Sequence, residues 1–112
     1  MALSFVQLFP PSQLTAVSGV LFDLTTPASA VLKNLRVRLT NATAAAVPVT
    51  LYVAPSATAS GPANCCLNAV SIGANGYLDV DIPTMKAGDT FRGLAGTAAA
   101  ITVHELGGVI YS

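Results

Sequence analysis

The sequence predicts an all-β protein: a single-domain antiparallel β-sandwich of about eight strands in a jelly-roll or Greek-key-like order. Apolar and polar residues alternate with a period of two through most of the chain, and no window of eleven or more residues has the helical period of 3.6. Turn residues separate the alternating segments at the spacing typical of two-sheet sandwiches. The 112 residues are enough for one core and too few for two.

The first part of the chain predicts an N-terminal segment and two strands. MALSFVQLFPP is apolar and ends at two prolines, so residues 1–18 are predicted to form an extended N-terminal arm or first strand, before a sandwich domain of residues 19–112. GVLFDL, residues 19–24, is the next predicted strand. In residues 31–41, Val37 and its apolar neighbours two residues away point to one face, and the arginines between them point to the other.

The middle of the chain predicts two further strands with clear alternation. In VPVTLYV, residues 47–53, the valines and Leu51 share the inner face, and Pro48 cannot donate to a ladder, which predicts a sheet edge there. Asn75-Gly76 is a preferred type I′ pair, because both residues tolerate positive φ. It predicts a hairpin between the strand before it and residues 77–82.

The end of the chain predicts a short strand, TFRGLA, and a closing strand that begins at about Ala100. Strict alternation from Val103 would place Glu105 in the core, and the residues after it keep no single phase. A β-bulge near Gly107-Gly108 would resolve the conflict by resetting the face that the chain presents. We expect His104 or Glu105 to turn toward solvent or a neighbouring subunit.

Composition excludes several function classes. The chain is 53% hydrophobic and 9% charged, with five basic and five acidic residues that form no run. Scattered charges with no net excess leave no electrostatic footprint for nucleic acid. No apolar stretch could span a bilayer, and the start is expected to be neither signal peptide nor anchor, so we expect no membrane partner. Such an apolar, uncharged surface predicts a subunit buried in an assembly.

Catalytic and metal motifs are incomplete. His104-Glu105-Leu106-Gly107 matches the start of a zinc-protease helix, but the second histidine position is Gly108 and His104 is the only histidine. A hydrolase with a nucleophile and base would have to work through His104, and no spacing favours one. We therefore predict a non-enzymatic protein with no catalytic residue, no cofactor and no metal ligand.

Three further patterns carry alternative interpretations. Calcium at Asp79, Asp81 and Asp89 is conceivable because hard cations prefer several oxygen ligands, but the chain has no EF-hand spacing. The adjacent Cys65-Cys66 is interpreted as two thiols packed as small apolar groups, with an interchain bridge as the alternative. Asn41-Ala42-Thr43 fits a glycosylation sequon and is interpreted as a coincidence.

Interface candidates come from the outward faces of strands and from the apolar arm. The arginines at 36 and 38 and the aspartates at 79 and 81 have equal spacing and opposite sign, so they could meet across neighbouring strands of one subunit or between subunits. Tyrosines on outward faces are suitable interface anchors. The interface candidates are Leu3, Phe5, Val6, Leu8, Phe9, Arg36, Arg38, Tyr52, Tyr77, Asp79, Asp81, His104 and Glu105.

Three sequence segments, taken in their order along the chain, resemble those of a known group of proteins. The phrases TTPASAVLKNLRVRLTNATAAAVPVTLYVAPS, NAVSIGANGYLDVDIPTMKAGDTFRGLA and AAAITVHELGGVIYS follow the GVLFDL strand. Together, over about residues 19–112, they resemble the small β-sandwich virion proteins of tailed bacteriophages. The resemblance implies a viral structural protein, a capsid decoration or cement subunit, commonly a homotrimer, that stabilises the head. It also leaves a tail or fibre module that binds a host receptor or glycan as the alternative.

The resemblance also implies partners and a location. The partners would be other copies of the chain and the phage major capsid protein or other virion proteins. The protein would be found in the virion, assembled in the cytoplasm of the bacterial host. The resemblance implies no enzymatic residue.

Overall fold

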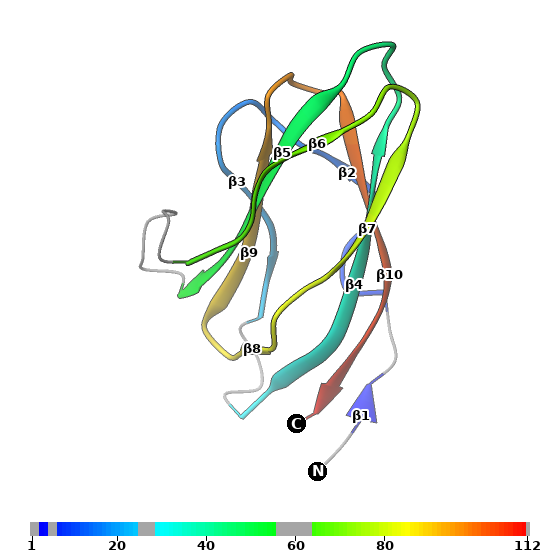
Figure 1. Cartoon of the computed structure of the whole chain (residues 1–112). Coiled ribbons are helices and arrows are strands. Elements are labelled where there is room, and N and C mark those ends of the chain that lie inside the picture. Colours follow the sequence, from blue (N-terminus) through cyan, green and yellow to red (C-terminus); the bar gives the residue numbers. More distant parts are fainter. Residues whose placement is uncertain (1–2, 5–6, 25–28, 56–63, 112) are drawn as a thin grey trace.

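The computed structural model describes residues 3–4, 7–24, 29–55 and 64–111, and these residues form two facing antiparallel sheets (Figure 1). The predicted all-β sandwich is confirmed. In the described ranges, no helix is long and apolar enough to cross a membrane. The strands are β1 (Leu3–Ser4), β2 (Ser12–Gln13), β3 (Gly19–Asp23), β4 (Val31–Asn41), β5 (Val47–Pro55), β6 (Cys65–Ile72), β7 (Tyr77–Asp81), β8 (Met85–Lys86), β9 (Asp89–Ala95) and β10 (Ile101–Tyr111).

The strand order is that of a jelly roll. The first sheet has the order β1-β10-β4-β7, with β2 also on β10 and β8 on β4, and the second sheet has the order β3-β9-β5-β6. Along the chain, the longer strands alternate between the two sheets, except for the hairpin of β5 and β6. This order, two sheets built from interleaved Greek keys, is the jelly-roll arrangement that the sequence predicted.

The core fills the space between the two sheets. From β4, Val37 and Leu39 are fully buried, and Leu51 of β5 and Phe91 of β9 lie at 0% exposure on the facing sheet. The residues of β4 and β5 among them are the inward members of the alternation predicted from the sequence. The period of two therefore predicts the inner faces of the long strands because successive side chains of a strand point to opposite faces.

The turn at residues 73–76 differs from the predicted hairpin. Gly76 N donates to Gly73 O at 3.0 Å and Asn75 has a φ of 55°, so a tight turn is present where Asn-Gly predicted one. However, β6 belongs to the second sheet and β7 to the first, so the turn crosses between the sheets. The prediction of a hairpin was wrong because a turn signal is local and does not specify which strands pair.

The position of Pro48 also differs from the prediction. β5 is an interior strand between β9 and β6, so it does not lie at a sheet edge. Pro48 O accepts a hydrogen bond from Gly96 N at 2.9 Å, and Gly96 lies one residue past the end of β9. The missing proline donor therefore falls at the end of the ladder, where little pairing is lost.

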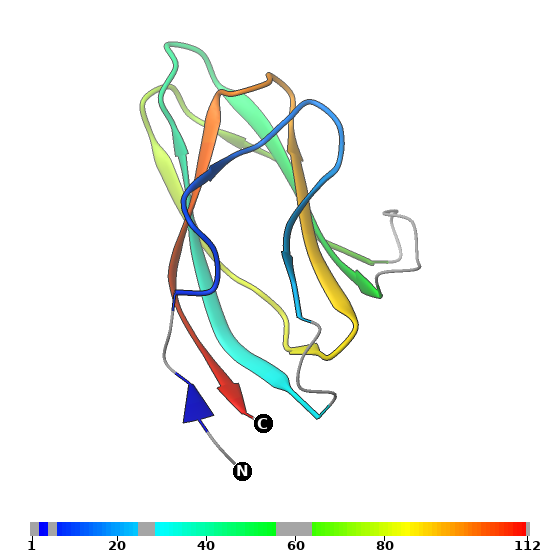
Figure 2. The same cartoon turned by 180° about the vertical axis from the view of Figure 1, so that it is seen from behind.

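The N-terminal segment is part of the sandwich. Phe9 is 5% exposed, and its ring lies 6.1 Å from that of Phe22 and 6.2 Å from that of Phe91. Leu14 is 1% exposed in the same core, which therefore extends across the predicted division at residue 18. Figure 2 shows the described part of this segment, residues 7–18 in blue, crossing from the first sheet to β3 in the second. The expectation that Phe9 serves as an interface residue is corrected: it fills the protein's own core.

Replacing Phe9 by Ala should lower the free energy of unfolding by about 3–5 kcal/mol, because it removes a buried aromatic side chain and leaves a cavity. Urea unfolding followed by circular dichroism measures the change. The control is Val17→Ala, at a side chain that is 73% exposed, where the change should stay within about 0.5 kcal/mol. Equal stability of the two variants would show that residues 7–14 are a detachable arm.

Candidate functional site

The charged side chains gather on one sheet. All ten Lys, Arg, Asp and Glu residues lie in described strands, seven in the first sheet and three in the second. On the outer surface of the first sheet, neighbouring strands β10, β4 and β7 present residues in register. We call this surface the charged face; its members are Arg36, Arg38, Tyr77, Asp79, Asp81 and His104.

Arg38 and Asp79 form the centre of the charged face. They lie directly opposite each other on β4 and β7, and Arg38 Nε and Nη2 donate to the two carboxylate oxygens at 2.7 and 2.9 Å. The Arg38 Cζ atom also lies 4.4 Å from the centroid of the Tyr77 ring. A forked pair of hydrogen bonds with a cation–π contact fixes the plane of the guanidinium group.

This pairing shifts both pKa values toward the charged forms. The hydrogen bond from Arg38 lowers the pKa of Asp79, and the positive charges of Arg38 and Arg36 lower it further. The hydrogen bond to Asp79 raises the pKa of Arg38. Both side chains are therefore charged at neutral pH.

Arg36 and Asp81 form a looser pair one step along the same strands. Arg36 Nε lies 3.6 Å from Asp81 Oδ1, and the side chains are 56% and 89% exposed. An exposed ion pair adds little to stability and acts mainly on orientation. The predicted meeting of the arginine and aspartate columns is confirmed, and it occurs within one subunit.

His104 and Glu105 lie at the irregular part of β10. The register shifts on either side of Gly107, which has a φ of 145°, so the predicted bulge is confirmed. His104 is exposed and lies opposite Arg38, as expected for a residue turned to solvent. Glu105 accepts a hydrogen bond from the backbone N of Leu8 at 3.0 Å. This carboxylate therefore fastens the N-terminal segment to β10.

The arm residues do not form one exposed surface. Leu3 lies in β1 opposite Tyr111, and Phe5 and Val6 lie outside the described residues. Leu8 packs against the core, next to the buried Phe9. The structure thus places the described part of the segment against its own sandwich.

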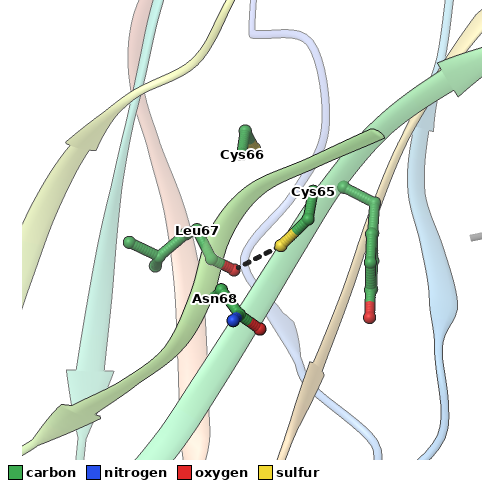
Figure 3. Close-up of a pocket in the computed structure, with 5 residues that line it drawn as sticks. Cys65, Cys66, Leu67 and Asn68 are labelled. Atoms are coloured by element: carbon green, nitrogen blue, oxygen red, sulfur yellow. Dashed lines mark hydrogen bonds between the residues drawn. The ribbon is translucent and has the colours of Figure 1, made fainter. Parts of the chain in front are cut away.

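The second sheet has a hollow beside β5 and the start of β6, and Figure 3 shows the residues that line it. Tyr52, half-buried, lines it together with the start of β6, and its volume is about 360 Å³. Cys65 Sγ lies 3.3 Å from Leu67 O, to which it donates, whereas Cys66 packs against the core. Burial, and to a lesser extent Cys65, raises the pKa of the Cys66 thiol to about 11. Both thiols are free, and they contact different surroundings.

The carboxylates proposed for calcium do not converge. Asp79 and Asp81 pair with arginines, and Asp89 accepts a hydrogen bond from Lys86 N at 3.0 Å in a different part of the fold. Within the residues that the structure describes, no three His, Cys, Asp or Glu side chains gather around a point that could hold a metal ion.

A second surface was missed by the sequence reasoning. Four connections meet at one end of the sandwich (Figure 1), and we call this surface the loop end. Backbone hydrogen bonds join them: Asn75 N to Thr43 O at 3.0 Å, Ala42 N to Ala100 O at 3.3 Å, and Ala99 N to Leu14 O at 3.1 Å. None of their residues is charged, and most are exposed Ala, Gly, Thr or Ser. The loop end comprises residues 14–18, 42–46, 73–76 and 96–100.

Asn41 holds the loop end together. It is 0% exposed, and its Nδ2 donates to the carbonyl oxygens of Ala45, Ile72 and Gly73 at 2.8, 3.0 and 3.3 Å. Its Oδ1 accepts from the backbone N and the hydroxyl of Thr43 at 2.9 and 2.7 Å. The sequon asparagine therefore has a structural role. Its sequence signal was an asparagine at an inward position of a strand, which needs a polar partner when buried.

Comparisons of the chain with protein-family models, with curated proteins and with solved structures find no match. Function is therefore inferred from the geometry of the charged face and the loop end.

Replacing Arg38 by Gln should raise the pKa of Asp79 toward the ordinary aspartate value of about 3.9, because the hydrogen bond is the main cause of the shift. Carbon-13 NMR titration of the carboxyl group measures it. Arg36→Gln is the matched control and should produce a smaller rise, because Arg36 acts only through its charge at longer range. Equal shifts in the two variants would contradict the assigned cause.

The same pair predicts the direction of a pH effect on stability. Since the folded-state pKa of Asp79 lies below its unfolded value, its contribution is complete above the unfolded pKa and is lost as the pH falls through the folded pKa. The difference in melting temperature between the wild type and Asp79→Asn should therefore shrink as the pH is lowered below about 4. A difference that stays constant into strong acid would contradict the ion pair.

In a Cys65→Ser variant, Cys66 should react with iodoacetamide at pH 8 at least about tenfold more slowly than a free cysteine peptide, because the thiolate is the reactive form. With a pKa of about 11, only roughly one thiol in a thousand is ionised at that pH. Mass spectrometry of timed samples measures the rate, and the urea-unfolded variant is the control. Equal rates for the folded and unfolded variants would refute the burial of Cys66.

Proposed function

We propose that this chain is a non-enzymatic structural subunit of a bacteriophage virion, most simply a capsid decoration or cement protein that oligomerises and binds the outside of the head. The loop end is the observation that carries the proposal. Jelly rolls occur in viral capsids but also in unrelated proteins, so the fold alone does not define the role. The chemistry of the surface has to supply the support.

The loop end suits a permanent contact with another protein. A surface without charges loses little solvation when a partner covers it, whereas burying an unpaired charge is costly. Small side chains let a partner's backbone approach closely. Val17, 73% exposed on the loop of residues 14–18, adds apolar area to this surface. The hydrogen bonds from Asn41 hold the loops in place before binding, which limits the entropy lost on association.

The position of the loop end on the molecule also supports the attachment of the subunit to the coat through that end. β1 and the end of β10 lie at the opposite end of the sandwich (Figure 1). A subunit that meets the coat with its loop end would therefore project its long strands outward, and the charged face along their side would remain available for other contacts.

The alternative is a tail or fibre module that binds a host receptor or a glycan. The observation that favours it is Tyr77, which is 62% exposed beside the Arg38–Asp79 pair. An exposed aromatic ring next to planar hydrogen-bonding groups can contact both the apolar and the polar sides of a sugar.

The variant with Ala44→Asp and Ala98→Asp should bind bare phage heads at least about tenfold more weakly than the wild type, because each new carboxylate would be buried unpaired at the contact. Both alanines are exposed in loops, so the fold should persist. Co-sedimentation with heads that lack decoration measures binding. The matched control is Thr84→Asp, an exposed position directly before β8, which lies at the other end of the sandwich (Figure 1).

Two results of this experiment would oppose the proposal. Undiminished binding of the double variant would show that the loop end is not the contact. Failure of the wild type to bind heads, together with binding to host cells or to purified surface polysaccharide, would favour the tail or fibre role.

A further inference from the structure

We propose that the charged face is a self-complementary contact that joins two copies of this chain face to face. This contact does not depend on a virion role, because it follows from the arrangement of two charged columns. β4 carries Arg36 and Arg38, and β7 beside it carries Asp81 and Asp79. The register places Arg36 level with Asp81 and Arg38 level with Asp79.

A two-fold axis turns this pattern onto itself. If the axis lies between two such faces, parallel to the strands and midway between β4 and β7, each β4 lies over the partner's β7 without a shift along the strand. Because each arginine is level with its own aspartate, it then also faces the aspartate at the same level of the partner subunit. An isologous contact of this kind repeats every favourable pair twice.

The same columns disfavour other arrangements. The face carries two positive and two negative side chains in separate columns, so a uniformly acidic or basic partner would meet like charge on one of them. Among the described strands, β7 is the last of its sheet, and pairing its outer edge with the β7 of a second copy would bring two aspartate columns together. A three-fold ring must join two different surfaces, so it would have to use other parts of the molecule.

The side chains of the charged face differ in how firmly they are held before this contact forms. Arg38 is already held by two hydrogen bonds and by the Tyr77 ring, so it loses little freedom on association. Arg36 and Asp81 are mostly exposed and 3.6 Å apart, and each can turn toward the partner. Facing sheets pack about 10 Å apart, a gap that an arginine and an aspartate can bridge together.

His104 provides a matched control on the same face. It lies on β10, on the side of β4 away from β7. In the two-fold arrangement it falls beyond the partner's β7 edge, where it meets neither charged column. His104→Ala should therefore leave the association unchanged, although it alters an exposed side chain of the charged face.

A charge-reversal cycle at the exposed pair tests the proposal. Arg36→Asp makes position 36 face Asp81 of the partner subunit with like charge, twice per dimer, and Asp81→Arg does the converse. Each single variant should raise the dimer Kd at least about tenfold. An equimolar mixture of the two should form the heterodimer, and the chain with both changes should dimerise like the wild type. Sedimentation equilibrium at low salt measures each case, with circular dichroism as the check on folding.

A salt titration of the wild type gives a second measurement that needs no variant. Exposed ion pairs are screened, so the dimer should weaken as salt rises from about 0.05 to 0.5 M. A wild type that stays monomeric at about 0.1 mM chain in low salt would overturn the proposal. An oligomer of any size that tolerates both single reversals would overturn it as well.

Discussion

The buried amide of Asn41 is the interaction on which both surfaces depend. Its side chain pairs the carbonyl groups of Ile72 and Gly73, at the point where the chain leaves the second sheet for the first. Its backbone N donates to Gly76 O at 2.8 Å, which fixes the first level of the β4–β7 ladder. Because register propagates along a ladder, this level also sets which arginine lies opposite which aspartate. One residue thus shapes the loop end and aligns the charged face.

The two surfaces differ in chemistry because charge is confined to strands. The connections of the loop end carry small uncharged residues, whereas the first sheet carries most of the charged side chains. A partner can cover an uncharged surface at little cost, so the burial of apolar area drives that contact. Ordered columns of charge instead attract a partner whose opposite charges lie at the same levels. A subunit with both surfaces can meet one partner at its end and another along its side.

The irregular part of β10 shows how the fold uses a local conflict. Gly107 permits the bulge, and Asn34, with a φ of 59°, marks a second irregularity on β4 opposite it. Glu105 lies opposite Val37 just before the bulge, and its carboxylate accepts a hydrogen bond from Leu8 N. The segment that carries Phe9 into the core is thereby fastened, which explains why an apolar N-terminal stretch need not be an arm for a partner.

The sequence by itself determined the strands, their inner faces and the bulge, because alternation is a property of each strand alone. Val37 and Leu51 are buried as their phase predicted, and the break in phase at Glu105 is enough to indicate the irregularity of β10. Only the tertiary structure decided which strands pair. The turn at residues 73–76 joins two sheets, and loops far apart in sequence form one uncharged end, since such proximity depends on the path of the whole chain.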